Sequence, residues 1–190
     1  MKKVYFITGN KTKARIAQDI LACKGITLTT LDIDAPEIQS LNGKEVCEYA
    51  AITCAQRVKK PVVKTDVSYS IPALNGFPGP FVKFINHMLT AQDLLHLMQG
   101  KKDRTVFMIE YLSYAQPDGS VISFQNTQEG TIAKKAATTK GRPFDQVIIR
   151  KGHTKHQSTI REDEMHTYFC EASVWHQFIE WVIKKNKKNL

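Results

Sequence analysis

The sequence contains no long hydrophobic run, and this absence excludes a class of protein. No apolar stretch approaches the roughly 20 residues of a transmembrane helix, so we expect neither a membrane span nor a membrane partner. The apolar stretch at residues 4–7 is too short for a signal peptide and predicts a first strand instead.

Cysteine is also scarce, and the four residues present are Cys23, Cys47, Cys54 and Cys170. Their spacing fits no zinc-binding pattern. Each lies in a helix-like stretch, which favours buried free thiols over a disulfide framework and suits a reducing, cytoplasmic location. A chain of 190 residues that is 42% hydrophobic buries roughly 70% of its unfolded surface, so it needs no disulfide or structural metal to fold.

Acidic residues are few compared with basic ones, 18 against 27, and the net charge is therefore +9. Such a balance attracts polyanions, whether nucleic acid, nucleotides or a membrane surface, and charge alone does not choose among them. Part of the excess lies in residues 184–188, which fit the solvated end of a helix. No aromatic cluster accompanies a basic strand, so we do not expect nucleic acid as a partner.

No internal repeat or low-complexity linker interrupts the chain, which predicts one domain over residues 1–190. Alternating or β-rich segments predict strands, and apolar residues three and four apart predict helices. Strands are expected at residues 3–7, 26–33, 61–66, 104–114, 120–131 and 147–149, and helices at 11–24, 45–58, 84–89, 91–98 and 171–185. Residues 74–80 hold two Gly and two Pro and predict no regular structure. This order indicates an α/β protein with a mixed sheet.

The first candidate site is the tripeptide Thr8-Gly9-Asn10, which follows the first strand and opens a helix that carries Lys13. A helix N-terminus offers unpaired N–H groups and a positive dipole end, so it can receive a phosphate. Gly9 permits close approach of the backbone, and Thr8 and Asn10 can hydrogen-bond phosphate oxygens. Lys13 adds positive charge. An Asn-capped helix with a surface lysine explains the same residues, and both interpretations stay open.

Two acids form the second candidate site. Glu37 follows the second predicted strand and Asp66 ends the third, at the edge where α/β proteins place their sites. Two carboxylates there can hold Mg²⁺ that bridges a substrate phosphate, because Mg²⁺ commonly takes only one or two protein carboxylates. Solvated loop acids are the simpler alternative.

Two loops supply the remaining candidates. The rigid segment at residues 74–80 precedes Lys83, and residues 141–145 contain Phe144 and Asp145. In the second loop the aromatic ring can stack on a nucleotide base and the acid can hydrogen-bond it, although a loop with a core Phe is equally consistent. His153 and His156 have a metal-compatible spacing, but no second pair supports a metal site.

In this order and spacing, these motifs resemble the inosine triphosphate pyrophosphatase family, which removes non-standard purine nucleoside triphosphates. The likeness covers most of the chain and rests on the segments at residues 6–13, 36–39, 62–83, 130–132 and 141–152. It implies a two-lobed α/β fold with a long mixed β-sheet and a central cleft. It further implies Mg²⁺-dependent hydrolysis of a nucleoside triphosphate, such as ITP, dITP or XTP, to monophosphate and pyrophosphate, commonly by a homodimer.

The resemblance also implies a role for each matching residue. The phosphates would be held by Thr8, Gly9, Asn10, Lys13 and Lys83. Glu37 and Asp66 would coordinate Mg²⁺, and Asp66 would orient and deprotonate the attacking water with Lys13 as its catalytic partner. Phe144 would stack on the base, and Asp145 would contact the edge of the base.

Three departures from the family pattern concern the acids and the base. Thr65 stands where the family usually has the first of two successive acids, and Arg142 replaces an aromatic wall of the base pocket. Residues 165–172 lack the family's Ser-His-Arg triplet, which reads the purine. Losing hydrogen bonds to a base edge can change discrimination by orders of magnitude, so we expect an altered base preference. The alternative function is a catalytically impaired, nucleotide-binding regulatory protein of the same fold.

Overall fold

The first part of the chain alternates strands and helices, as its hydrophobic pattern predicts. The computed structural model describes residues 3–137, 140–170 and 172–188. Its first elements are β1 (Lys3–Ile7), α1 (Lys11–Ala22), β2 (Thr27–Leu31), α2 (Gly43–Val58) and β3 (Val62–Ile71). The later elements are β4 (Phe77–Gly79), α3 (Val82–Met88), α4 (Ala91–Leu97), β5 (Thr105–Ala115), β6 (Val121–Ile132), α5 (Pro143–Val147), β7 (Ile148–Arg150), α6 (Glu162–Cys170) and α7 (Trp175–Lys188).

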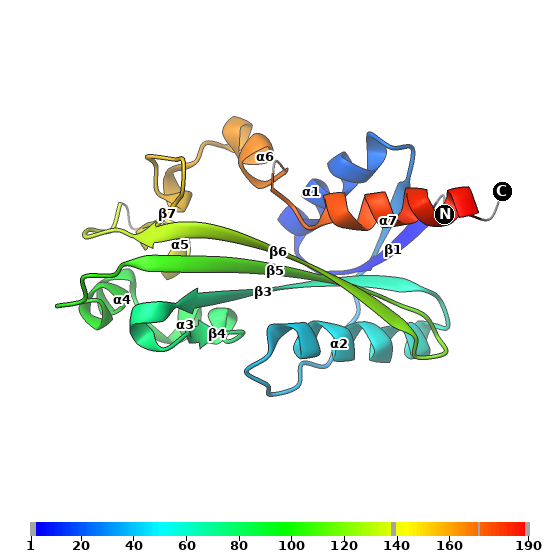
Figure 1. Cartoon of the computed structure of the whole chain (residues 1–190), viewed down its shortest axis with the longest axis horizontal. Coiled ribbons are helices and arrows are strands. Elements are labelled where there is room, and N and C mark those ends of the chain that lie inside the picture. The colour runs from blue at the N-terminus through cyan, green and yellow to red at the C-terminus, as the bar shows by residue number, and fades with distance from the viewer. Residues whose placement is uncertain (1–2, 138–139, 171, 189–190) are drawn as a thin grey trace. The chain divides into compact units, whose positions relative to one another are not determined.

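The strands form one mixed sheet of seven strands, which confirms the predicted α/β class. The order is β2-β1-β3-β5-β6-β7, and β4 pairs with β3 off this path (Figure 1). β1 pairs in parallel with both β2 and β3, whereas β3–β4 and β6–β7 are antiparallel. A tight turn joins β5 to β6, and in it the N–H of Gly119 donates to the carbonyl of Gln116 at 3.0 Å.

The chain divides into two compact units that share the long strands β3, β5 and β6. The first unit comprises residues 1–66, 110–126 and 169–190, and the second comprises residues 67–109 and 127–168. Each unit has its own hydrophobic core, and each is described separately below.

The core of the first unit is built on both faces of β1. Because side chains alternate along a strand, Val4 and Phe6 point to one face and Tyr5 and Ile7 to the other. The first pair packs with α1 and α7, and the ring of Phe6 meets Trp175 edge-on at 5.1 Å. The second pair packs with α2. Figure 1 shows α1 and α7 on one side of these strands and α2 on the other.

The core of the second unit gathers residues from short helices and from the ends of the long strands. Its fully buried members include Met98 after α4, Val106 on β5, Ile132 on β6 and Phe144 on α5. These segments are distant in sequence, so the unit depends on the pairing of the long strands.

The prediction that the third strand ends at Asp66 is wrong. β3 continues to Ile71, because β4 pairs antiparallel with its second half and Tyr69 lies opposite Gly79. The segment at residues 74–80 is therefore partly regular. It contains β4 after a 3₁₀ turn at Pro72–Leu74, and Asn75 there adopts a left-handed conformation with φ of 54°.

The C-terminal region also differs from its prediction. α6 was not predicted, and the last helix begins at Trp175 rather than at residue 171, which lies outside the described residues. Cys23 is exposed and Cys170 is half-buried, so only Cys47 and Cys54 are buried, although all four thiols are free as predicted. Within the described ranges, every helix is too short or too polar to cross a bilayer.

Candidate active site

The turn from β1 into α1 is an asparagine-capped helix start. Asn10 Oδ1 accepts hydrogen bonds from the N–H groups of Thr12 at 3.0 Å and Lys13 at 3.1 Å. Thr8 Oγ1 accepts from the N–H of Asn10 at 3.1 Å. The cap therefore satisfies three of the N–H groups that a helix start leaves open. The O–H of Thr8 and the side-chain NH₂ of Asn10 are still able to donate hydrogen bonds to an incoming anion.

Sheet register places one acid, Asp66, near this turn. Phe6 is paired with Thr30 on β2 and with Val63 on β3, and both pairings are parallel. β1 ends at Ile7 and β2 ends at Leu31, whereas β3 continues through Asp66, three residues beyond Val63. Asp66 thus lies in the middle of β3, past the end of β1, and not at the carboxyl end of its own strand as the sequence predicts.

The side chain of Asp32 closely approaches Gly9, a contact that the sequence analysis missed. A Cβ atom at Gly9 would lie 2.7 Å from Asp32 Oδ1, closer than side-chain contacts allow. Asp32 follows directly after β2, and its carboxylate rests against the backbone of the turn. The negative charge of Asp32 would repel a phosphate at this turn. A cation bound to the phosphate would reduce that repulsion.

Lys13 and Asp66 interact electrostatically within the first unit. Burial lowers the pKa of the Lys13 ammonium from its ordinary 10.5, and the carboxylates of Asp66 and Glu110 partly oppose that fall. Lys64 on β3 lowers the pKa of Lys13 further by repulsion. A partly desolvated lysine beside a carboxylate is typical of sites that handle charged substrates. Glu110 lies on β5, and no periodicity in the sequence marks it as part of this cluster.

A buried thiol and a chain of hydroxyl groups support the cluster. Burial raises the pKa of Cys47 to about 12, and its Sγ donates to the carbonyl of Lys64 at 3.4 Å. Ser123 Oγ donates to Glu48 at 2.7 Å and lies 2.9 Å from Ser113 Oγ. A thiol with so high a pKa stays protonated at neutral pH, so Cys47 acts here as packing and not as a nucleophile.

Glu37 stands apart from these contacts. It lies in the irregular segment between β2 and α2, is exposed, and makes no hydrogen bond or ion pair within the described part of the chain. Across the residues that the structure describes, no group of three or more His, Cys, Asp or Glu side chains is arranged to hold a metal ion. Asp66, Asp32 and Glu37 thus do not form a ready metal centre in the described structure. Single carboxylates of this kind suit only a hard cation such as Mg²⁺, which takes one or two protein carboxylates and completes its shell with water and phosphate.

The remaining predicted site residues belong to the second unit. Lys83 is exposed on α3, with no partner among the described residues. Phe144 is 0% exposed, packs edge-on against Tyr69 at 5.1 Å, and donates its N–H to Asn86 Oδ1 at 3.2 Å. The ring has no free face for a base, so burial supports the core role of this residue.

The sequence matches the Ham1 family over residues 4–181. The chain therefore belongs to the Ham1 family. It is 31% identical to a dITP/XTP pyrophosphatase of Methanopyrus kandleri, over 94% of this chain and 95% of the relative. It is 30% identical to a dITP/XTP pyrophosphatase of Methanosarcina acetivorans, over 97% of this chain and 100% of the relative.

Solved structures of Ham1 proteins confirm the fold. A HAM1 protein from Coxiella burnetii superposes with a TM-score of 0.80 at 17% identity, over 97% of this chain and 100% of that one. The Ham1 protein of Staphylococcus aureus gives a TM-score of 0.76 at 18% identity, with both chains covered in full. The two-lobed, mixed-sheet class expected from the sequence is thus the class that this Ham1 chain adopts.

A buried polar cluster in the second unit of this Ham1 protein was not predicted. The Arg150 guanidinium lies over the ring of Tyr168 at 3.8 Å and donates to the Tyr168 carbonyl. Burial raises the pKa of the Tyr168 hydroxyl, and the positive charge of Arg150 opposes that rise. The charge of the Asp145 carboxyl also acts on Tyr168. Burial raises the pKa of Asp145, and the positive charge of Arg142 partly opposes that rise.

Tyr168 lies in the segment where the resemblance expects the purine-reading triplet. Met165 and His166 of this segment have side chains that lie outside the described residues. Elsewhere in the same unit, Ser68 on β3 is 4% exposed, and its hydroxyl has no hydrogen-bond partner among the described residues. A buried polar atom without a partner is uncommon in native proteins and marks a place where a bound group can donate or accept.

Proposed function

We propose that this chain is a nucleoside triphosphate pyrophosphatase that releases monophosphate and pyrophosphate. The observation that carries the proposal is the electrostatic interaction of Lys13, in the first turn of the capped helix α1, with Asp66 on β3; a triphosphate there would find a cation, a carboxylate and hydrogen-bond donors in one unit. The printed names of the Methanopyrus and Methanosarcina relatives support the same activity.

In the proposed reaction, water attacks the α-phosphorus and the bond to the bridging oxygen breaks. Asp66 orients the water and accepts its proton, the water oxygen stays on the monophosphate, and the electron pair of the broken bond leaves with pyrophosphate. Lys13 stabilises the charge that develops on the phosphate oxygens, and the donors of Thr8 and Asn10 hold the chain of phosphates in place. Lys83 is proposed to add positive charge to the same phosphates.

We further propose that Glu37 and Asp66 hold Mg²⁺, with Asp32 as an additional oxygen donor. Their carboxylates match the preference of Mg²⁺ for one or two protein carboxylates plus substrate phosphates. When bound, the ion would neutralise phosphate charge and polarise the α-phosphorus. It would also remove the repulsion between Asp32 and a phosphate at the turn.

The base preference is proposed to differ from that implied by the resemblance. Asp145 and Arg142 remain candidates for contact with the base edge, and the Arg150–Tyr168 pair occupies the segment where the Ser-His-Arg triplet is missing. Inosine, deoxyinosine and xanthosine triphosphates are the substrates to test first.

The homodimer and the cytoplasmic location also remain predictions. Light scattering of the purified protein tests whether it is a homodimer.

The second candidate function is nucleotide binding without catalysis. Thr65, which stands where an acid is expected, is 4% exposed and points into the protein, so it offers no carboxylate to the site. A protein of this kind would bind a triphosphate in a calorimeter and release no pyrophosphate over hours.

Pyrophosphate release with Mg²⁺ across a panel of nucleoside triphosphates tests both candidates. We expect release from the wild type and a loss of at least about a hundredfold in kcat for Asp66→Asn, because the proton acceptor is removed. Asp118→Asn is the matched control, since Asn serves equally well in the turn between β5 and β6. Full activity of Asp66→Asn would refute the assigned role, and binding without release would favour the second candidate.

A further inference from the structure

The second unit contains a large basic cavity, and none of the site residues proposed above lines it. It has a volume of about 920 Å³ and is lined by the end of α4, the turn that follows it and the segment after β6. We call it the basic pocket, and its twelve lining residues are Gln92, Leu95, His96, Met98, Gln99, Gly100, Lys101, Lys102, Arg104, Lys134, Lys135 and Ala136. Its volume lies at the upper end of the range of about 300–1,000 Å³ typical of ligand sites.

The charge of the basic pocket is of one sign. Five of its lining side chains are cationic and none is acidic. Lys101, Lys102, Lys134 and Lys135 have no ion-pair partner among the described residues, whereas Lys44, Lys151 and Lys155 elsewhere each meet a glutamate. The nearest acid in sequence, Asp103, is outside the lining and accepts a hydrogen bond from the N–H of Thr105 at 2.8 Å. Clustered cations without counter-charges create a positive potential that favours an anionic ligand.

Arg104 holds the walls of the basic pocket together. Its Nε and Nη2 donate to the carbonyls of Ile132 and Ala133 at 2.7 Å each, and its Nη1 donates to the carbonyl of Met98 at 3.2 Å. The Arg104 carbonyl in turn accepts from the N–H of Ile132 at 2.8 Å. The end of α4 and the end of β6 are thereby fixed to one side chain. Because these hydrogen bonds lie within the chain itself, they fix the frame of the pocket and reduce the ordering that binding requires.

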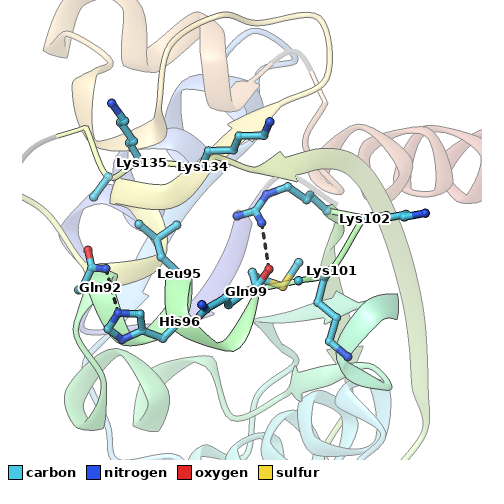
Figure 2. A pocket seen from close by; sticks show the side chains of 12 residues that line it. Gln92, Leu95, His96, Gln99, Lys101, Lys102, Lys134 and Lys135 are labelled. Atoms are coloured by element: carbon cyan, nitrogen blue, oxygen red, sulfur yellow. Dashed lines mark hydrogen bonds between the residues drawn. The ribbon is translucent and has the colours of Figure 1, made fainter.

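The arrangement of the lysines indicates the shape of the ligand. Figure 2 shows Lys134 and Lys135 on one side of the basic pocket and Lys101 and Lys102 on another, with side chains that extend in different directions. They do not converge on one point, as they would around a single phosphate. Apart from His96, the lining offers no ring on which a base could stack. An extended anion that consists of phosphates alone fits both observations.

We propose that the basic pocket binds a linear chain of inorganic phosphates. Lysine ammonium groups bind phosphate as point charges, and four of them spread over the pocket can each meet a different phosphate of one chain. Binding of this kind releases counterions and therefore weakens steeply as salt rises. The site is separate from Thr8, Asn10, Lys13 and Asp66, which belong to the other unit, so its occupation does not depend on the proposed hydrolysis.

The test is the binding of fluorescently labelled inorganic polyphosphate, about 14 phosphates long, measured by anisotropy. We expect the variant K101Q/K102Q/K134Q/K135Q to bind at least about tenfold more weakly than the wild type, with a shallower dependence on salt. The control K24Q/K59Q/K60Q/K184Q removes the same charge from exposed lysines of the first unit and should bind within about twofold of the wild type.

Three results would overturn the proposal. Equal weakening in the control would mean that net charge alone attracts the polyphosphate. Loss of binding in Lys13→Gln would assign the polyphosphate to the other unit. Binding of an oligothymidylate with the same number of phosphates as tightly as polyphosphate would assign the basic pocket to a nucleic-acid strand. Loss in the pocket variant alone, with Lys13→Gln and the control binding normally, supports the proposal whether or not pyrophosphate release is observed.

Discussion

The carboxylate of Glu110 accepts a hydrogen bond from the backbone N–H of Val174 at 2.9 Å, and Ser173 Oγ approaches the same oxygen at 3.4 Å. Val174 directly precedes α7, so a charge on β5 stabilises the positive end of that helix. The same carboxylate opposes the fall in the pKa of Lys13. Glu110 therefore connects the start of α7 with the lysine of the candidate active site.

Replacing Glu110 by Gln removes this charge and keeps the shape of the side chain. We expect the free energy of unfolding to fall by about 1–2 kcal/mol, because a charge-assisted hydrogen bond becomes a neutral one. The pKa of Lys13 should fall further, since one of the two opposing carboxylates is gone. Denaturant unfolding measures the first effect. Glu129→Gln, which breaks only the exposed contact with Lys151, serves as the control and should change stability by less than about 0.5 kcal/mol.

The lowered pKa of Lys13 makes the affinity for triphosphate sensitive to alkaline pH. The ammonium in the folded protein loses its proton at a pH below the ordinary 10.5, so affinity should decline before that pH is reached. Between the two pKa values the unfolded chain holds a proton that the folded chain does not, and stability therefore rises with pH across this window.

Triphosphate binding and thermal unfolding of the wild type, followed as the pH rises toward 10.5, test both consequences. Lys13→Met tests the role of the charge itself at pH 7. We expect it to weaken triphosphate binding by at least about tenfold and to leave the protein as stable as the wild type or more stable, because a desolvated charge disappears. Calorimetry and thermal unfolding of the same samples would check this. Unchanged binding would remove Lys13 from the phosphate site, whereas a loss of stability would mean that its attraction to Asp66 and Glu110 outweighs its desolvation.

Phe144→Ala distinguishes a core residue from a base-stacking one. Because the ring is fully buried, we expect a loss of about 3–5 kcal/mol in the free energy of unfolding. Phe84→Ala removes a ring that is 50% exposed on α3 and should destabilise by less than about 1 kcal/mol. A variant at Phe144 that stayed stable and changed only KM for the nucleotide would restore the stacking role.

The four free thiols should differ strongly in reactivity. Cys23 is exposed and should react with a maleimide within minutes, whereas the buried Cys47, with its pKa of about 12, should react only on unfolding. Mass spectrometry of the native protein after brief labelling would show one rapidly modified cysteine. Labelling that persists in Cys23→Ser at the same rate would mean that a second thiol is accessible.

Local pattern was enough to predict most of the elements and the phosphate turn. β1, α1 and α2 follow from apolar spacing, and Asn10 caps its helix as its residue type favours. The position of Asp66 could not be predicted in the same way, because the length of β3 depends on pairing with β4, a contact between separate segments.

Several contacts within each unit could not be predicted from local sequence pattern for a similar reason. Asp32 meets Gly9 only through the register of β1 and β2, and Glu110 reaches the Lys13 cluster from β5. Arg150 looks like an ordinary strand residue until Tyr168 is placed against it. Each of these contacts joins segments that are distant in the sequence, and neither segment's sequence predicts the contact.

The interleaving of the two units has a consequence for how this protein can evolve and be engineered. The chain passes between the units at residues 66/67, 109/110, 126/127 and 168/169, so neither unit is a continuous piece of sequence. A half of the molecule cannot be exchanged for that of a relative by a single recombination event. A single crossover would instead join parts of both units from one parent to parts of both units from the other.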